Sequence, residues 1–174
     1  MHNRSSWELE QTDVDGVYLN APLTETIYMR QPKGYEVPRK EHLVCWLLHT
    51  LYSLKQAGRE WYFHFCDAML EPGFTCCQTE HVVFHRYKDK NILIVVVEVD
   101  DLTMVRNTQQ TITAFKQQLR QKFKIKDLGD LQWILGIEVK QDHATRMISF
   151  SQQAYINRYW RSSVYMMQSP CQAH

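Results

Sequence analysis

The sequence ILIVVVEVDDLTMV, at residues 92–105, carries the strongest structural signal in the chain. It begins with an unbroken apolar run whose β-branched residues fall on both faces, as is typical of a strand buried on both sides. Asp100 and Asp101 interrupt the run, and a second, shorter apolar piece follows them. The pattern therefore predicts two strands, over residues 91–99 and 102–105, that meet at the acidic pair.

The segments on either side of this stretch alternate between strand and helix patterns. Residues 81–87 form a further predicted strand, joined to the next one by the polar turn Lys88-Asp89-Lys90. Residues 43–48 are compatible with either a strand or a helix. The other predicted strands cover residues 7–14, 27–29, 133–139 and 147–150, and the predicted helices cover residues 59–70, 107–123 and 152–160. This mixed order predicts an α+β fold, an antiparallel sheet backed by helices.

Composition limits the possible classes of protein. The chain has 174 residues, is 44% hydrophobic and 12% aromatic, and has a formal net charge of +1. It is long enough and apolar enough for one compact domain, and it lacks the global positive charge of many nucleic-acid binders. We find no signal peptide and no apolar run long enough to cross a bilayer, so we expect an intracellular protein without membrane contact. Its five cysteines are expected to be reduced thiols.

Carboxylates mark the ends of the predicted strands. Asp13 ends one strand, while Asp100 and Asp101 lie between two others, so neighbouring strands would bring all three together. Carboxylate oxygens suit Mg²⁺, and two such ions can hold the attacking and leaving oxygens of a phosphoryl transfer. An acidic pair between strands is also typical of a solvated hairpin turn, and the spacing alone leaves both interpretations open.

Four motifs resemble the reverse transcriptases of copia-type retrotransposons, in the order and spacing of that family, over roughly residues 7–160. They are QTDVDGVYLNAPLTETIYMRQPKGYE (11–36), LYSLKQAGREWY (51–62), VEVDDLTMV (97–105) and KIKDLGDLQWILGIEV (124–139). The resemblance implies an RNA-directed DNA polymerase of the right-hand type, present here as a single truncated domain over residues 1–174. The implied parts are a palm at about 7–20 and 60–140, partial fingers at about 21–58, a primer-grip hairpin at about 131–150, and the start of a thumb at about 151–174.

The resemblance also implies roles for individual residues. Asp13, Asp100 and Asp101 match the catalytic, metal-binding aspartates, which would hold two Mg²⁺ or Mn²⁺ ions. Tyr18 matches the aromatic residue beneath the incoming sugar, where a bulky ring excludes a 2′-hydroxyl; without the family it is an ordinary strand tyrosine. The implied partners are an RNA or DNA template-primer, a deoxynucleoside triphosphate (dNTP) and the rest of a retroelement polyprotein.

Further positions follow from the same match. Lys55 and Gln56 correspond to the loop near the incoming nucleotide and template, and Lys126 lies where a proton donor to pyrophosphate would stand. The segment with Trp133, Leu135 and Gly136 resembles the hairpin that grips the primer. Each position also has a structural interpretation. Lys55 would be a surface lysine and Gln56 a residue at a helix N-terminus. Lys126 would belong to a solvated charge run over residues 116–126, and Gly136 to a bulge.

Several residues depart from the family pattern. Glu98 stands where tyrosine is usual, and because it lies two residues before Asp100 we expect both to share one face of the strand. Gly58 replaces a proline, and Asp15 and Gly16 replace lysine and threonine, which adds negative charge near the triphosphate. We also expect the N-terminal part of the fingers to be missing. Together with these departures, this leads us to expect a partial copy with reduced or no polymerase activity.

Two rival interpretations remain open. The chain could be a non-catalytic nucleic-acid-binding fragment that stacks bases on aromatic side chains. We expect Trp61, Trp133 and Trp160 to lie in the core, which counts against that role. The second rival is a zinc site formed by Cys76, Cys77, His81 and His85, although adjacent cysteines are poorly spaced for one ion.

Overall fold

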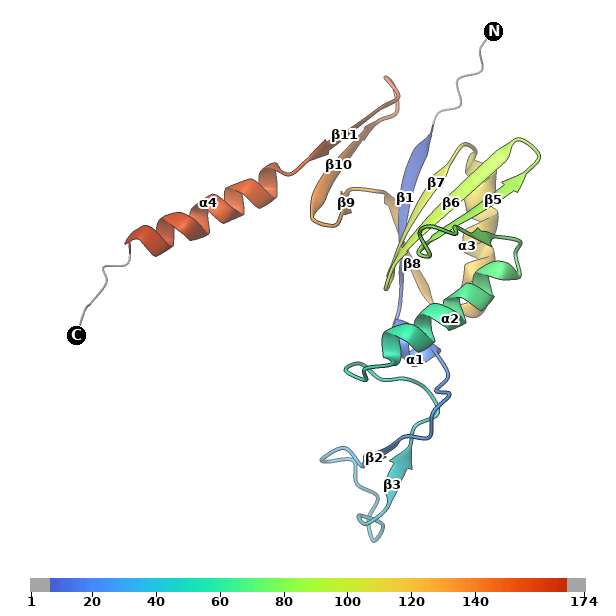
Figure 1. Ribbon diagram of the computed structural model, residues 1–174, viewed down its shortest axis with the longest axis vertical. Coiled ribbons are helices and arrows are strands. Elements are labelled where there is room, and N and C mark those ends of the chain that lie inside the picture. The colour runs from blue at the N-terminus through green and yellow to red at the C-terminus, as the bar shows by residue number, and fades with distance from the viewer. Residues whose placement is uncertain (1–6, 169–174) are drawn as a thin grey trace.

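A six-stranded antiparallel sheet forms the centre of the molecule (Figure 1). The computed structural model describes the backbone of residues 7–168 and the side chains of residues 7–161. In spatial order the strands are β4 (Thr75–Cys76), β5 (Val83–Lys88), β6 (Asn91–Glu98), β7 (Asp101–Arg106), β1 (Glu8–Val14) and β8 (Ile125–Asp130). The chain's first strand thus lies inside the sheet, next to the return strand that follows the acidic pair.

Two helices cover one face of this sheet. Helix α2 (Ala57–Leu70) and helix α3 (Gln109–Lys122) both contribute to a single buried cluster with the inward side chains of the strands. The apolar residues of α3 recur at helical spacing and are fully buried, which explains why this segment packs as a helix against the sheet. The predicted α+β fold, an antiparallel sheet backed by helices, is therefore confirmed.

Smaller elements extend from the two ends of the central sheet. The short helix α1 (Val17–Asn20) leads to a two-stranded sheet of β2 (Tyr28–Arg30) and β3 (Val44–Trp46), so the segment left open at 43–48 is a strand. A three-stranded sheet follows β8 and consists of β9 (Trp133–Ile134), β10 (Ile137–Asp142) and β11 (Met147–Ser151). Helix α4 (Gln153–Gln168) then points away from the central sheet (Figure 1).

The predicted continuous strand over residues 133–139 is wrong. A two-residue turn at Leu135 and Gly136 divides it into β9 and β10, which pair with each other. Both turn residues have positive φ, 51° and 76°, the backbone that a tight type I′ hairpin requires. Gly136 therefore serves a turn rather than a bulge.

The described helices and cysteines bear on two properties of the chain, membrane spanning and disulfide bonding. No helix among residues 7–168 is long and apolar enough to span a membrane. The described cysteines, Cys45, Cys66, Cys76 and Cys77, are free thiols as expected. Cys171 lies outside the described residues, as does the end of the predicted thumb segment from residue 169 onward.

Candidate active site at the end of the central strands

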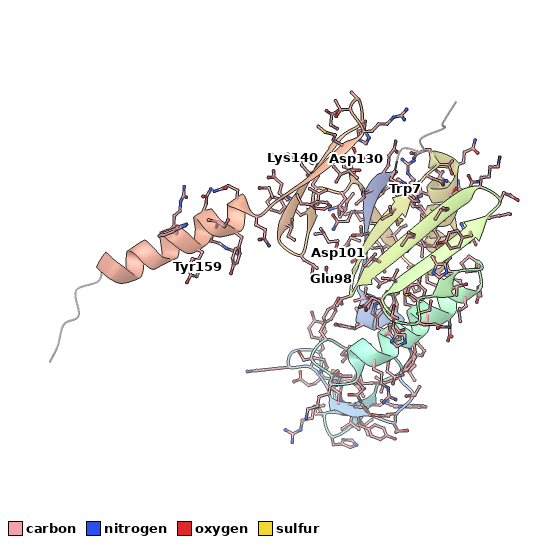
Figure 2. All side chains as sticks on the ribbon, turned by 45° about the horizontal axis from the view of Figure 1, so that its top comes forward. Trp7, Glu98, Asp101, Asp130, Lys140 and Tyr159 are labelled. Carbon is pink, nitrogen blue, oxygen red and sulfur yellow. The ribbon has the colours of Figure 1, made fainter. Side chains whose placement is uncertain are left out.

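A row of charged residues crosses four adjacent strands at one end of the sheet. Asp13 on β1 lies directly opposite Asp101 on β7, and Glu98 on β6 lies opposite Asp101 from the other side. Lys126 on β8 lies opposite Asp13 and ends the row. Because residues paired across antiparallel strands share a face, the side chains of this row lie together. Figure 2 shows Glu98 and Asp101 next to each other at this end of the central sheet.

Asp100 belongs to a tight turn rather than to a strand. Strand β6 ends at Glu98 and β7 begins at Asp101, so Val99 and Asp100 form the turn between them. The prediction that Glu98 and Asp100 share a strand face is therefore wrong, and the acid that Glu98 faces is Asp101. Val99 has φ of 56°, an unusual conformation for a β-branched residue.

Two hydrogen bonds hold this turn in place. The indole N–H of Trp61 on α2 donates to the carbonyl of Val99 at 2.8 Å. The backbone N–H of Val14, the last residue of β1, donates to the carbonyl of Asp100, also at 2.8 Å. Strained backbone persists where its surroundings fix it, and here a helix and a neighbouring strand both do so.

The acids influence each other's ionisation. Burial raises the pKa of Asp13 above its ordinary value, and the nearby carboxylates of Asp100, Asp101 and Asp15 raise it further, while Lys126 lowers it. Asp15 does add a carboxylate here, as expected, but it also pairs with Lys124 at 2.5 Å. The added charge is therefore partly balanced by a lysine.

The carboxylates suit a divalent cation in their chemistry. Hard oxygen ligands from neighbouring strands are the donors that Mg²⁺ and Mn²⁺ prefer, and a cation would relieve the repulsion that raises the pKa of Asp13. As they stand, no three His, Cys, Asp or Glu side chains among those described are close enough to hold a metal ion. Asp101 accepts a hydrogen bond from the side-chain amide of Gln11 at 2.9 Å. Asp101 must therefore leave Gln11, or share its oxygens, to join a ligand set.

Three of the four nucleotide-site candidates lie on α1 and just before α2, and the fourth, Lys126, is on β8 in the row already described. Tyr18 is on α1 and not on a strand, and its ring contacts Tyr52 edge-on with centroids 4.9 Å apart. Tyr18 also lines an apolar cavity of about 180 Å³ together with Trp61 and Val99, so it lies near the turn that carries Asp100. Lys55 is exposed. Gln56 occupies the N-cap position of α2 without a side-chain capping hydrogen bond, and its amide donates to Glu25 at 2.8 Å.

The primer-grip candidates lie apart from these residues, on the three-stranded sheet of β9, β10 and β11, called the small sheet below. Trp133, Leu135 and Gly136 line a cleft of about 590 Å³ whose other wall is the start of α4, including Tyr155 and Arg158. Trp133 is 45% exposed and Trp160 is 65% exposed, so the prediction that both lie in the core is wrong. Of the three tryptophans predicted to lie in the core, only Trp61 on α2 is buried.

Some residues of interest were not predicted from the sequence. Gln11 touches the acidic row, and Lys116, assigned to a solvated charge run, is buried with 4% exposure. The position of Gln11, two residues before Asp13 on the same strand, is the one signal that places it on the same face. For Lys116 the helical spacing with Ile112 and Leu119 was available, but its charge favoured a surface interpretation.

The proposed zinc ligands make other contacts. The Cys76 thiol lies 3.4 Å from the carbonyl of His81, and the Cys77 thiol lies 3.4 Å from the hydroxyl of Thr79. Among the described side chains, no three histidine, cysteine or acidic residues lie close enough together here to hold a zinc ion.

Comparisons with known proteins agree with the four motifs. A family model described as "Reverse transcriptase (RNA-dependent DNA polymerase)" matches residues 1–171. The chain is 39% identical over 152 residues to a retrovirus-related Pol polyprotein from transposon TNT 1-94 of Nicotiana tabacum, a match that covers 87% of this chain and 11% of that protein. It is 34% identical over 151 residues to the corresponding polyprotein from transposon RE1 of Arabidopsis thaliana, covering 87% and 10%.

A yeast relative is shorter. The chain is 32% identical over 144 residues to a putative transposon Ty5-1 protein of Saccharomyces cerevisiae, covering 83% of this chain and 46% of that protein. The chain thus spans only about a tenth of the two plant polyproteins, at 11% and 10% of their lengths. No solved structure matches it.

Proposed function

Since the chain belongs to the reverse transcriptase (RNA-dependent DNA polymerase) family, we propose that it adds deoxynucleotides to the 3′-hydroxyl of a primer under the direction of a template. The observation that carries this proposal is the register that sets Asp13 directly opposite Asp101, beside the turn with Asp100. Residues far apart in the chain are thereby brought to one end of one sheet. We propose likewise that its substrates are a template-primer and deoxynucleoside triphosphates, and that it is part of a longer polyprotein, as its relatives are named.

In this proposal Asp13, Asp100 and Asp101 would hold two Mg²⁺ or Mn²⁺ ions. Such ions, when bound, supply the positive charge that stabilises the attacking and leaving oxygens of a phosphoryl transfer. The strands and the turn keep the backbones of the acids at one end of the sheet. Forming the ligand set would then require side-chain movement, including that of Asp101 away from Gln11. The exposure of Asp100 leaves that acid accessible to a triphosphate and a primer end.

The nucleotide would be bound by residues around the turn. The ring of Tyr18 lies beneath the sugar and excludes a 2′-hydroxyl, which selects deoxynucleotides. Lys126, next to Asp13 in the row, donates a proton to the departing pyrophosphate. Lys55 and Gln56, at the start of α2, contact the incoming base and the template strand.

The primer would be held by the small sheet and α4. Trp133, Leu135 and Gly136 contact its last phosphates, and the exposed ring of Trp133 with Arg158 across the cleft offers stacking and charge to a strand. In the terms of the right-hand polymerases, the central sheet with α2 and α3 is the palm. The β2–β3 sheet belongs to the fingers, β9–β11 form the primer grip, and α4 begins the thumb.

Glu98 is the departure with the clearest expected effect. It adds a carboxylate directly opposite Asp101 and takes the place of an aromatic surface for the primer end. We propose that it lowers the activity of this copy. Restoring the family's residue with Glu98→Tyr is expected to increase incorporation, whereas Glu80→Tyr, an exposed acid before β5, is a control that is expected to have no effect.

The function is tested by primer extension on poly(rA) primed with oligo(dT), with Mg²⁺ or Mn²⁺. We expect Asp13→Asn and Asp100→Asn to reduce incorporation by about 10²–10³-fold, while Glu80→Gln, an exposed acid before β5, leaves it unchanged. Equal incorporation by the unsubstituted chain and Asp100→Asn would exclude the polymerase assignment.

A second candidate is a non-catalytic nucleic-acid-binding fragment. The observation that favours it is the exposure of Trp133 beside a cleft that also contains Tyr155 and Arg158. Binding of a labelled single strand that persists in chelator, without any incorporation, would support this candidate over the polymerase.

A further inference from the structure

Strand β8 contains a bulge two residues after Lys126, its member of the row of charged residues. Asp127 lies opposite Thr12 of β1, whereas the preceding residue of β1, Gln11, lies opposite Gly129. Leu128 is therefore an extra residue with no partner on β1, which is the definition of a β-bulge. Gly129 has φ of 72°, a conformation that a bulge commonly requires and that glycine adopts without strain.

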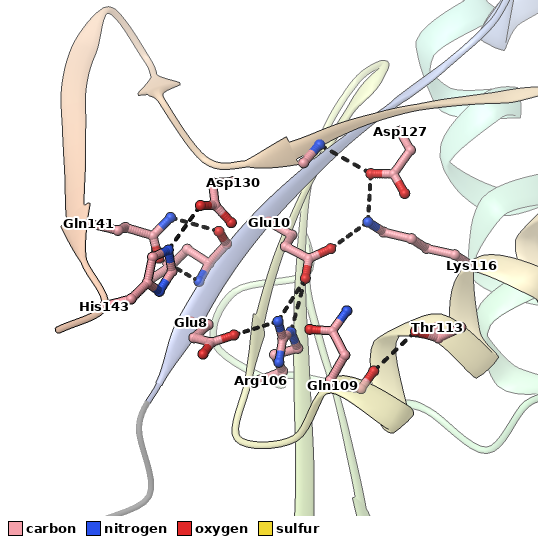
Figure 3. Close-up of polar contacts among 12 residues, drawn as sticks. Glu8, Glu10, Arg106, Gln109, Thr113, Lys116, Asp127, Asp130, Gln141 and His143 are labelled. Carbon is pink, nitrogen blue, oxygen red and sulfur yellow. Dashed lines mark hydrogen bonds and ion pairs between the residues drawn. The ribbon is translucent and has the colours of Figure 1, made fainter. Parts of the chain in front are cut away.

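A buried group of charges holds the residue just before the bulge (Figure 3). Asp127 accepts a hydrogen bond from the Lys116 ammonium at 2.6 Å and another from the backbone N–H of Gly129 at 3.1 Å. Lys116 is nearly fully buried on α3 and also binds Glu10 at 2.5 Å. Glu10 is in turn bound by Arg106 at 2.9 Å, so the helix is tied to β1, β7 and β8.

The bulge decides which charge lies next to Asp13. Asp127 points to the helix side of the sheet, with Thr12, and Lys126 therefore points to the opposite side, with Asp13. Since neighbouring strand residues alternate between faces, a shift of one residue would exchange the two.

Such a shift is compatible with the rest of the sheet. At one end the N–H of Asp15 bonds the carbonyl of Lys124 at 2.9 Å, and at the other the N–H of Leu131 bonds the carbonyl of Leu9 at 2.9 Å. Between these ends β8 has one residue more than β1, so an extra residue must be accommodated somewhere. The end contacts do not determine where.

If the extra residue were Lys126 instead of Leu128, two things would change. Asp127 would lie opposite Asp13 and add a carboxylate to a row that already contains Asp101. Leu128 would lie opposite the buried Thr12, on the apolar side of the sheet. Burial of a leucine that is now 42% exposed favours this other arrangement. The contacts of Asp127 oppose it, as does the positive φ of Gly129, which suits a bulge at its present place.

We propose that Lys116 is a positioning residue: by holding Asp127 on the helix side of the sheet, it fixes the bulge at Leu128 and keeps Lys126 beside Asp13. The consequence for catalysis rests on the proposed polymerase function, whereas the register itself does not. Removing either partner of the Lys116–Asp127 pair allows the bulge to move.

The test is a direct measurement of register by NMR on the isotopically labelled chain. In the unsubstituted protein, nuclear Overhauser cross-peaks connect the backbones of Asp13 and Lys126. In Asp127→Ala we expect these cross-peaks to be lost and cross-peaks between Asp13 and residue 127 to appear. Asp130→Ala, on the same strand and exposed, is the matched control and keeps the original pattern.

A second variant separates position from stability. Lys116→Met leaves Glu10 paired with Arg106 and is expected to shift the same cross-peaks, while Lys116→Arg restores them. Arg120→Met removes a more distant cation, 3.8 Å from the same acid, and is expected to change nothing.

Unchanged Asp13–Lys126 cross-peaks in both folded variants would overturn the proposal. Failure of Asp127→Ala to fold would also overturn it, because Asp127 would then support the whole fold rather than the register. Primer extension is measured separately on the unsubstituted chain. If that chain never incorporates nucleotides while the variants shift the register, the polymerase function is refuted and the role of Lys116 stands.

Discussion

The indole N–H of Trp61 donates to the carbonyl of Val99, 2.8 Å away, and so connects helix α2 directly to the turn that carries Asp100. The ring itself is buried against Phe65 and Phe123, with centroids 5.5 and 5.3 Å away. One side chain thus belongs to the apolar core and also fixes the backbone next to the acids. The position of the turn depends on the packing of the helix.

Trp61→Phe keeps an aromatic ring but removes the donor. We expect the free energy of unfolding to fall by about 1–3 kcal/mol, from one lost hydrogen bond and a small cavity. Urea denaturation followed by circular dichroism measures this change. Trp46→Phe is the control, because Trp46 on β3 is 61% exposed. Equal losses in both variants would contradict the role assigned to the hydrogen bond.

Val99→Gly is expected to stabilise the fold. Positive φ costs a residue with a Cβ roughly 1–2 kcal/mol, whereas glycine adopts it freely but loses about 0.5–1 kcal/mol through unfolded-chain entropy. The expected net gain is about 0.5–1 kcal/mol in thermal or urea unfolding. Val105→Gly, within β7, lacks positive φ and is expected to destabilise. A loss of stability in Val99→Gly as large as in Val105→Gly would mean that the turn is unstrained.

The contact between the small sheet and β8 is expected to depend on pH. The imidazole of His143 lies 2.9 Å from the carboxylate of Asp130, and this hydrogen bond and charge raise the pKa of the histidine. A raised histidine pKa adds stability that is fully present below the ordinary value of about 6.5 and is lost as pH rises through the folded value.

Hydrogen exchange of the β10 amides, corrected for intrinsic rates, measures this effect. Protection is expected to fall as pH rises from about 6 toward 8.5, and His143→Gln is expected to show no such fall. The same pH dependence in His143→Gln would assign the effect to another group.

Leu135→Asn is expected to strengthen the turn between β9 and β10. Both turn residues have positive φ, and Asn-Gly is the pair that such turns favour. The expected gain is about 0.5–1 kcal/mol in the stability of the hairpin, read from local hydrogen exchange. Because Leu135 is 72% exposed, little buried apolar area is lost. Weaker protection of the β9 and β10 amides in this variant would contradict the assigned turn.

Much of the fold could be predicted because local patterns and tertiary packing agree. The apolar run before Asp100 can be buried only as a central strand, and the helical spacing of residues 107–123 is consistent along its length. The pairing of Asp13 with Asp101 followed from strand ends that meet at one edge. The family predicted from the four motifs is confirmed by the matches to known proteins.

The errors arose where tertiary contacts outweigh local preference. Leu135 is not a typical turn former, and Gly136 was interpreted as a bulge within one strand, so the break in residues 133–139 was not predicted. Lys116 was assigned to the surface by its charge, and its burial depends on acids from two distant strands. The exposure of Trp133 depends on how the small sheet and α4 stand away from the core, which periodicity does not reveal.

The most direct test of the central claim is a titration of the labelled chain with Mn²⁺, followed by paramagnetic broadening of amide signals. We predict that the signals of Asp13, Asp100 and Asp101 broaden first, at less than one equivalent of metal, and that Asp13→Asn weakens binding by at least about tenfold. Asp130→Asn is predicted to bind like the unsubstituted chain. Broadening that begins elsewhere and spares these acids would contradict the account.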